Sequence, residues 1–206
     1  MKKLVSFFAA CLLLALSSYV GPQAGYQVGD QATDFKLKNV DGQLVSLANN
    51  QAAKGYIVVF TCNTCPYAKA YEDRIIKLHE KYAPQGYPVV AINPNDPAIV
   101  PGDSFAAMRA QASKKKYPFP YLFDETQQVA RAYGATRTPH LYVLTRQGKG
   151  SKFNVSYIGA IDDNSEDAGQ VKTKYVENAM TDILAGKPAS VSSTKAIGCT
   201  IKWKKA

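Results

Sequence analysis

Residues 56–75 read YIVVFTCNTCPYAKAYEDRI, an apolar run followed by two cysteines, a proline and an amphipathic pattern. Residues 56–60 are β-branched or aromatic without alternation, which is typical of a strand buried on both faces. From Pro66 onward apolar side chains recur at helical spacing, and Pro66 suits the first helical turn because its missing N–H would have no partner there. The sequence therefore predicts that Cys62 and Cys65 lie where a central strand ends and a helix begins.

Two cysteines at this spacing are compatible with a redox couple, a permanent disulfide or half of a metal site. The N-terminus of a helix favours a thiolate, because unpaired N–H groups and a partial positive charge lie there. A thiolate attacks the disulfide of a partner, and the second cysteine then resolves the mixed disulfide. We interpret Cys62 and Cys65 as a redox couple and expect both sulfurs to be accessible to a visiting molecule.

A second candidate segment is Arg137-Thr138-Pro139-His140, directly before a predicted strand. Pro is nearly the only residue that tolerates a cis peptide bond, and a proline at a strand entrance facing the cysteines is a candidate for one. The carbonyl and N–H of Thr138 would then pair with an extended substrate that Pro139 helps to hold. His140 is either near the sulfurs, where an imidazolium would lower a thiol pKa, or an ordinary surface residue.

The other elements follow from hydrophobic periodicity and turn signals. Strands are predicted at residues 35–38, 43–47, 88–92, 121–123, 140–144 and 153–158, and helices at residues 66–82, 103–113, 126–133 and 171–183. The first two strands form a hairpin around Asp41-Gly42, and Gly102 or Asp103 is expected at the N-cap of the second helix. This order predicts an α/β fold with a mixed central β-sheet flanked by helices.

Residues 1–24 are interpreted as a secretory signal peptide, with two lysines followed by an apolar run at residues 4–16. That run is shorter than the about 20 apolar residues that span a bilayer, although a retained membrane anchor is the alternative. Cys11 lies inside the run and is expected to leave with the signal, which is cleaved after Ser17 or near Ala24. We expect an exported protein, periplasmic or extracellular, without a stable membrane span after cleavage.

Residues 25–186 are predicted to form one domain, and residues 187–206 a basic C-terminal tail that carries Cys199. The tail holds five lysines and no acidic residue, and it accounts for much of the formal charge of +9. The domain has no basic stripe apart from residues 114–116, which argues against nucleic-acid binding. Three roles for Cys199 stay open: it resolves an oxidised Cys65, pairs with another chain, or takes no part in catalysis.

These features together resemble the thioredoxin-like superfamily, whose hallmarks are a CxxC motif after a central strand and a cis-proline across from it. Further stretches look like its peroxiredoxin-like branch, the alkyl hydroperoxide reductase and thiol-specific antioxidant (redoxin) proteins. They are residues 28–30, 34–35, 117–121, 124–127, 161–164 and 198–204. The resemblance extends over residues 26–204 and implies a thioredoxin-like fold with an N-terminal β-hairpin and an antioxidant or redox enzyme.

The resemblance implies two assignments of the nucleophile. In thioredoxins the first cysteine attacks, which makes Cys62 the nucleophile and Cys65 the resolving cysteine. In peroxiredoxins the peroxidatic cysteine belongs to P-x-x-x-T-x-x-C-P, a motif that falls on Cys65 and leaves Val58 and Cys62 where its proline and threonine should be. Arg137 then matches the arginine that polarises the peroxide.

The main hypothesis is an exported thiol–disulfide oxidoreductase in which Cys62 attacks, Cys65 resolves and Pro139 holds the substrate. It is expected to need no bound cofactor. Its expected partners are protein or small-molecule disulfides, thiols or hydroperoxides, together with a thiol protein as electron donor. One alternative is a thiol-dependent peroxidase with Cys65 peroxidatic and Cys62 or Cys199 resolving. The other is a metallochaperone that binds copper or zinc through Cys62, Cys65 and His140.

Overall fold

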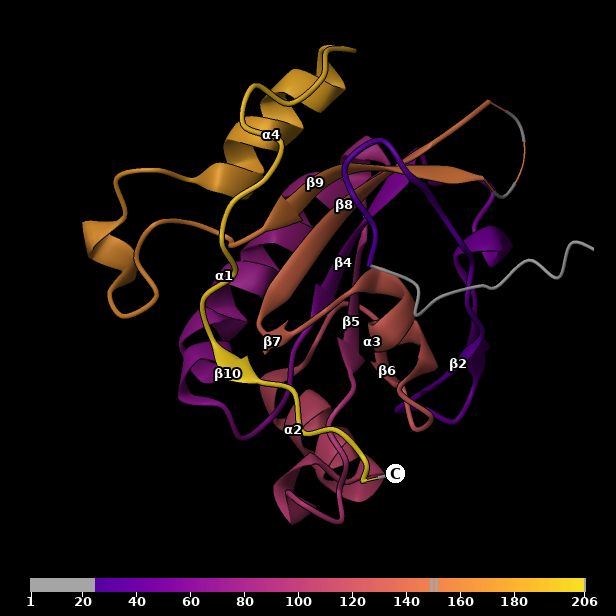
Figure 1. Cartoon of the computed structure of the whole chain (residues 1–206), viewed down its shortest axis with the longest axis vertical. Coiled ribbons are helices and arrows are strands. Elements are labelled where there is room, and N and C mark those ends of the chain that lie inside the picture. The colour runs from indigo at the N-terminus through magenta and orange to yellow at the C-terminus, as the bar shows by residue number, and fades with distance from the viewer. Residues whose placement is uncertain (1–24, 149, 151, 206) are drawn as a thin grey trace, which may run out of the picture.

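The computed structural model describes residues 25–148, 150 and 152–205 of the chain (Figure 1). The predicted signal peptide, residues 1–24, lies outside the described residues. Within the described part of the chain, no helix combines the length and the apolar character needed to cross a bilayer.

One mixed β-sheet forms the centre of the molecule (Figure 1). Its strand order is β1 (Gln31–Ala32), β9 (Phe153–Gly159), β8 (His140–Arg146), β4 (Gly55–Phe60), β5 (Val89–Asn93), β6 (Tyr121–Phe123), β2 (Leu37–Asn39) and β3 (Leu44–Val45). Strand β4 runs parallel to β5 and antiparallel to β8, and β2 with β3 forms the N-terminal hairpin. The predicted α/β class, mixed sheet and hairpin are confirmed.

Helices pack on both faces of this sheet (Figure 1). They are α1 (Pro66–Tyr82), α2 (Phe105–Lys115), α3 (Gln128–Tyr133) and α4 (Tyr175–Leu184). Single turns of 3₁₀-helix occur at Leu47–Asn49, Ala83–Gln85, Pro101–Asp103 and Ala168–Gln170.

Strand β4 is apolar throughout because it lies between two hydrophobic layers. Ile57 and Val59 belong to the layer beneath α1, α2 and α4. Tyr56, Val58 and Phe60 point to the opposite layer, which α3 and the N-terminal segment cover. Successive side chains of a strand alternate between faces, so a continuous apolar run serves both layers.

Helix α1 buries one stripe, which includes Tyr71, Ile75, Leu78 and Tyr82 as the periodicity predicts. His79, on the same helix, is half-buried. Its ring packs near Phe119, and its Nδ1 accepts a hydrogen bond from the N–H of Val89.

The N-cap of α2 also differs from the expectation. Ser104 takes this position, and its hydroxyl accepts a hydrogen bond from the N–H of Ala107. Asp103 instead ends the preceding 3₁₀ turn with its side chain fully buried. A serine is as good an N-cap as an aspartate, so Asp103 is released for another contact.

The C-terminal segment, residues 192–204, is docked along the domain by its backbone. The backbone of Ser192 and Thr194 pairs with Ile158 of β9, and Ile201 is buried in the α3-side layer. In Figure 1 this yellow segment descends from α4 and passes through β10 (Cys199–Thr200), which pairs with β7 (Arg137–Thr138).

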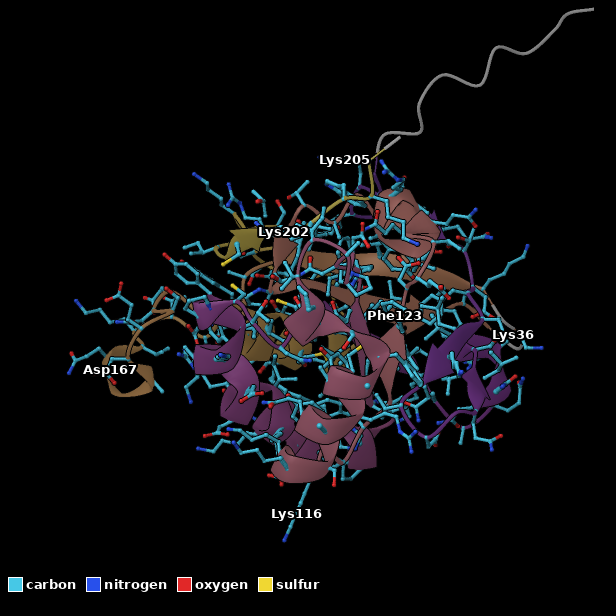
Figure 2. All side chains as sticks on the ribbon, turned by 90° about the horizontal axis from the view of Figure 1, so that it is seen from below. Lys36, Lys116, Phe123, Asp167, Lys202 and Lys205 are labelled. Atoms are coloured by element: carbon cyan, nitrogen blue, oxygen red, sulfur yellow. The ribbon has the colours of Figure 1, made fainter. Side chains whose placement is uncertain are left out.

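Hydrogen bonds hold the far end of this segment. The N–H of Lys202 donates to Asn95 Oδ1 at 2.9 Å, and its carbonyl accepts a hydrogen bond from Gln127 Nε2 at 2.8 Å. Lys205, near the end of the segment, and Lys116, at the end of α2, lie at the outer surface (Figure 2). The backbone of the tail is therefore part of the fold, while basic side chains along it remain in solvent.

Because Ile201 is only 3% exposed, we expect Ile201→Ala to lower the free energy of unfolding by about 2 kcal/mol. Ile197→Ala is the matched control, since Ile197 lies in the same segment but is 43% exposed, and it should change stability by less than about 0.5 kcal/mol. Urea denaturation of both variants measures the difference. Equal stabilities would mean that the segment is not docked in solution.

Candidate active site

The two cysteines lie on the loop that joins β4 to α1, at the edge of the sheet where β4 ends. Cys65 is the N-cap of α1, and Pro66 follows in the first turn. The sulfur of Cys65 therefore lies among the unpaired N–H groups of the helix N-terminus, where negative charge is stabilised. This location agrees with the sequence prediction.

A buried carboxylate holds the loop between the cysteines. Asp103 Oδ1 accepts a hydrogen bond from the N–H of Asn63 at 2.8 Å. Its Oδ2 accepts hydrogen bonds from Thr64 Oγ1 at 2.8 Å and from Asn95 Nδ2 at 2.7 Å. Since Asn63 and Thr64 are the two residues between the cysteines, Asp103 determines how the loop presents the sulfurs.

This role of Asp103 was not predicted from the sequence. The available signal was an acidic residue in the segment that follows β5, because the carboxyl ends of parallel strands meet at one edge of a sheet. That signal names the edge but not the contact, which depends on how the chain folds back between β5 and α2.

Thr138 and Pro139 form the opposite wall of the site. The peptide bond between them is cis, as the sequence predicts, and Thr138 is fully buried. Thr138 Oγ1 lies 3.3 Å from Cys62 Sγ, and the carbonyl of Thr138 accepts a hydrogen bond from the Cys65 thiol at 3.1 Å. One residue thus contacts both sulfurs across the site.

Cys199 closes the site from the C-terminal side. Strand β10 runs antiparallel to β7, with Cys199 opposite Thr138. The N–H of Cys199 donates to Cys65 Sγ at 3.4 Å, and its side chain packs against the cluster of Cys62, Cys65 and Ala68. The structure therefore brings all three cysteines of the domain and tail together.

All three cysteines are free thiols, and the pair is almost completely covered. Cys62 is 5% exposed and Cys65 is 3% exposed, whereas Cys199 is half-buried. The expectation that both sulfurs of the pair are accessible is wrong for this conformation. The reason is that β10 lies along β7, where an extended substrate was expected to pair.

The surroundings shift the pKa values of Cys62 and Cys65 in opposite directions. The pKa of Cys65 is lowered because the Cys62 thiol hydrogen-bonds to its sulfur, with further hydrogen bonds from Cys199 and from the N–H of Ala68. The pKa of Cys62 is raised by that same hydrogen bond with Cys65, then by burial and by the negative charge of Asp103. Cys65 is the thiol of the pair that ionises first.

His140 and Arg137 lie close to the site, but their contacts differ from those expected. Burial, with the nearby charge of Arg137, lowers the pKa of His140 to about 4, so its imidazole is neutral near neutral pH. A neutral ring supplies no positive charge to a thiolate, which does not favour the tuning role considered for His140. The guanidinium of Arg137 donates to the carbonyl of Gly198 at 2.8 Å and so holds the C-terminal segment.

Among residues 25–148, 150 and 152–205, no group of three or more His, Cys, Asp or Glu side chains is arranged to hold a metal ion. The described residues include Cys62, Cys65 and His140. The metallochaperone hypothesis therefore has no geometric support.

Comparison with known proteins identifies the family. The model of the AhpC/TSA family matches residues 28–150. A solved structure of an uncharacterized conserved protein from Geobacillus kaustophilus is 37% identical, with a TM-score of 0.80 over 87% of this chain and 94% of that chain.

The curated relatives include both a thiol-disulfide oxidoreductase and a peroxiredoxin. The thiol-disulfide oxidoreductase ResA of Halalkalibacterium halodurans is 23% identical over 65% of this chain and 71% of its own length. Chloroplastic peroxiredoxin Q of Arabidopsis thaliana is 26% identical over 69% of each chain. The mixed sheet flanked by helices and the relatives described above indicate an oxidoreductase of thioredoxin-like fold. The chain belongs to the AhpC/TSA family.

The first prediction from the site concerns ionisation. We expect the ultraviolet absorbance of reduced wild-type protein to report a thiolate at pH values below those at which an ordinary thiol ionises, because Cys65 is hydrogen-bonded at a helix N-terminus. This signal should vanish in Cys65→Ser and persist in Cys199→Ser. A low-pH thiolate that survives in Cys65→Ser but not in Cys62→Ser would reverse the assignment.

The second prediction concerns stability and pH. The folded-state pKa of His140, about 4, is below the ordinary value of 6.5, so the unfolded chain binds a proton first as the pH falls. The neutral imidazole of His140 therefore contributes about 3 kcal/mol to the free energy of unfolding. This contribution is complete above about pH 6.5 and is lost as the pH falls toward 4.

His140→Gln should remove this part of the acid destabilisation when urea unfolding of both proteins is compared over that range. His79→Gln is the control, since burial lowers the pKa of His79 as well, and it should leave the contribution of His140 intact. An unchanged pH profile in His140→Gln would show that His140 is hydrated in solution.

Proposed function

We propose that this chain is an exported thiol–disulfide oxidoreductase that uses Cys62 and Cys65 as a dithiol/disulfide couple. The observation that carries the proposal is that both sulfurs contact Thr138, directly before the cis bond to Pro139. Membership of the AhpC/TSA family and the similarity to ResA support it.

In the proposed reaction, the Cys65 thiolate attacks one sulfur of a partner disulfide and forms a mixed disulfide, and one partner sulfur leaves as a thiolate. Cys62 then loses its proton and attacks Cys65 Sγ, which closes the Cys62–Cys65 disulfide. The second partner sulfur leaves and takes up a proton. The partner gains two electrons and the couple loses two, and the reverse sequence oxidises a partner dithiol.

This proposal assigns the attack to Cys65, whereas the thioredoxin resemblance implies Cys62. The position of Cys65 at the N-cap of α1 and the hydrogen bonds to its sulfur support the assignment. The raised pKa of Cys62 suits a resolving cysteine, because that thiol stays protonated until the mixed disulfide has formed.

The proposed partners are protein or small-molecule disulfides and thiols, with a thiol protein as electron donor. The backbone of Thr138 is the proposed pairing edge for a peptide substrate, next to Pro139. A peptide reaches this edge only when β10 leaves β7, since the two strands are paired. The proposed location, periplasmic or extracellular, rests on the signal-like sequence of residues 1–24.

A thiol-dependent peroxidase is the second candidate, because the family contains peroxiredoxins and Cys65 is the thiol of lowered pKa, directly before Pro66. In that reaction the Cys65 thiolate attacks a hydroperoxide, forms a sulfenic acid and releases an alcohol. Cys62 or Cys199 then attacks the sulfenic sulfur, which yields a disulfide and water. Arg137 in this structure donates to Gly198, a contact that does not favour its role in polarising a peroxide.

Single variants distinguish these functions. We expect Cys62→Ser and Cys65→Ser each to lower the dithiothreitol-coupled reduction of insulin disulfides by about a hundredfold or more, because two-electron exchange needs both sulfurs. A serine cannot form the second sulfur–sulfur bond, although Cys62→Ser should still form a mixed disulfide at Cys65.

Hydroperoxide consumption is the counter-assay. If Cys62→Ser retains enzymatic consumption of hydroperoxide while Cys65→Ser loses it, the peroxidase replaces the oxidoreductase as the function. Full insulin reduction by Cys62→Ser would also contradict the proposed exchange.

A further inference from the structure

The C-terminal segment occupies the place expected for a substrate. Thr138 offers its backbone beside the couple, and the strand that pairs with it is β10 of the same chain, with Cys199 directly opposite Thr138. Cys199 therefore stands where the cysteine of a bound peptide would stand in the reaction proposed above.

Contacts on both sides of Cys199 fix this arrangement. Arg137 binds the carbonyl of Gly198 at 2.8 Å, and the N–H of Ile201 donates to the carbonyl of Thr136 at 3.1 Å. Further along, the guanidinium of Arg131 lies 4.5 Å from the ring centre of Trp203.

Gly198 permits the close approach of the two strands. A Cβ at this position would lie 2.2 Å from the carbonyl oxygen of Thr138. Only a residue without a side chain lets the backbone before Cys199 lie so close to the cis peptide bond.

The three cysteines also differ in their access to solvent. The couple is almost fully buried, whereas Cys199 is half-buried at the edge of the site. A buried couple cannot meet a protein partner directly in this conformation. Cys199 is the sulfur through which electrons can pass without opening the fold.

We propose that Cys199 is a third redox-active cysteine, which exchanges with Cys65 and carries the disulfide of the buried couple to the surface. This inference rests on the proposed function of Cys62 and Cys65. It adds a catalytic residue and selects a partner that acts at Cys199, namely a protein with a reactive dithiol or disulfide.

The step is an internal thiol–disulfide exchange. Cys199 loses its proton and attacks Cys65 Sγ of the Cys62–Cys65 disulfide, so that a Cys65–Cys199 bond forms and the Cys62–Cys65 bond breaks. Cys62 leaves as a thiolate and takes up a proton, and no net oxidation occurs. A partner thiolate then attacks Cys199 Sγ and releases Cys65, and the second partner thiol resolves the mixed disulfide.

The charges around Cys199 agree with this order of events. In the reduced site, burial and the Cys65 sulfur raise the pKa of Cys199 to about 11, while Lys202 and Arg137 act in the opposite direction. When Cys65 is held in a disulfide, its negative charge is absent and the two cations remain. Cys199 is therefore easier to ionise when the couple is oxidised, which is when it must attack.

The test is disulfide mapping of the full chain in a glutathione redox buffer, by acid quenching, alkylation and mass spectrometry. We expect the Cys62→Ser variant to hold a Cys65–Cys199 disulfide rather than glutathione adducts, because a docked thiol acts at a millimolar or higher effective concentration. The wild type should contain both Cys62–Cys65 and Cys65–Cys199 bonds. Glutathione adducts alone, or a disulfide between two chains, in Cys62→Ser would overturn the proposal.

A displaced cysteine provides the matched control. The double variant Cys199→Ser with Thr200→Cys moves the thiol by one residue, to the exposed face of β10. It should not form a disulfide with Cys65. A disulfide in this control at the same level as in the unshifted chain would mean that a mobile tail, rather than the paired strand, brings the sulfurs together.

Reduction kinetics distinguish the proposed exchange at Cys199 from the function of the Cys62–Cys65 couple. The Cys199→Ser variant should still form the Cys62–Cys65 disulfide, and failure to do so would contradict the proposed function itself. Reduction of this oxidised variant by a thioredoxin dithiol should be slower than in wild type by about tenfold or more, whereas reduction by dithiothreitol should change less. Equal rates with the protein dithiol would remove Cys199 from the pathway and leave the function of the couple intact.

Discussion

The pairing of β4 with β8 is the constraint on which the candidate site depends. The two strands are antiparallel, with Phe60 opposite His140. The residues that follow β4 must therefore lie beside those that precede β8. This register brings Cys62 against Thr138, although the two residues are far apart in the sequence. A shift by one residue would turn the apolar side chains of β4 to the wrong layers, so the packing of the core also protects the geometry of the site.

Contacts from Asp103 on one side and from Thr138 on the other then fix the positions of the two sulfurs. The Asp103 carboxylate holds Asn63 and Thr64 by hydrogen bonds in a fully buried position. Buried charges are tolerated when hydrogen bonds satisfy them, and here the partners are the loop itself and Asn95. On the other side, Thr138 contacts both sulfurs and also pairs with Cys199. Cys65 lies between these elements and is the sulfur that both other cysteines reach.

The burial of the couple links the structure to its chemistry. Low exposure protects a thiolate from oxidants in solution, but it also keeps protein partners away. In the proposed exchange, a docked segment that carries its own cysteine would reconcile these demands, since exchange would proceed between neighbouring sulfurs while only Cys199 meets solvent. The segment is held by backbone hydrogen bonds, including those of Lys202, and by the buried side chain of Ile201, whereas the side chains of Lys195, Lys204 and Lys205 are exposed.

Much of the fold can be read from local patterns, because burial imposes them on each element separately. The unbroken apolar run of residues 56–60 is a direct consequence of a strand with two covered faces, and the stripe of α1 follows from its single buried side. The pair of cysteines, the proline behind it and the distant Thr138–Pro139 were recognisable for a different reason. Each is a short motif that requires particular residues at a fixed spacing.

The local patterns do not determine which distant segments contact each other, and these long-range contacts appear only in the tertiary structure. Asp103 looked like a helix cap but binds the loop between the cysteines, and the basic tail, predicted to lie outside the domain, pairs with β7. A two-residue strand such as β10 has no periodicity of its own, so its partner is specified only when the rest of the chain has folded. The same holds for the ionisation of Cys62 and Cys65, because hydrogen bonds and burial act through neighbours that only the folded chain assembles.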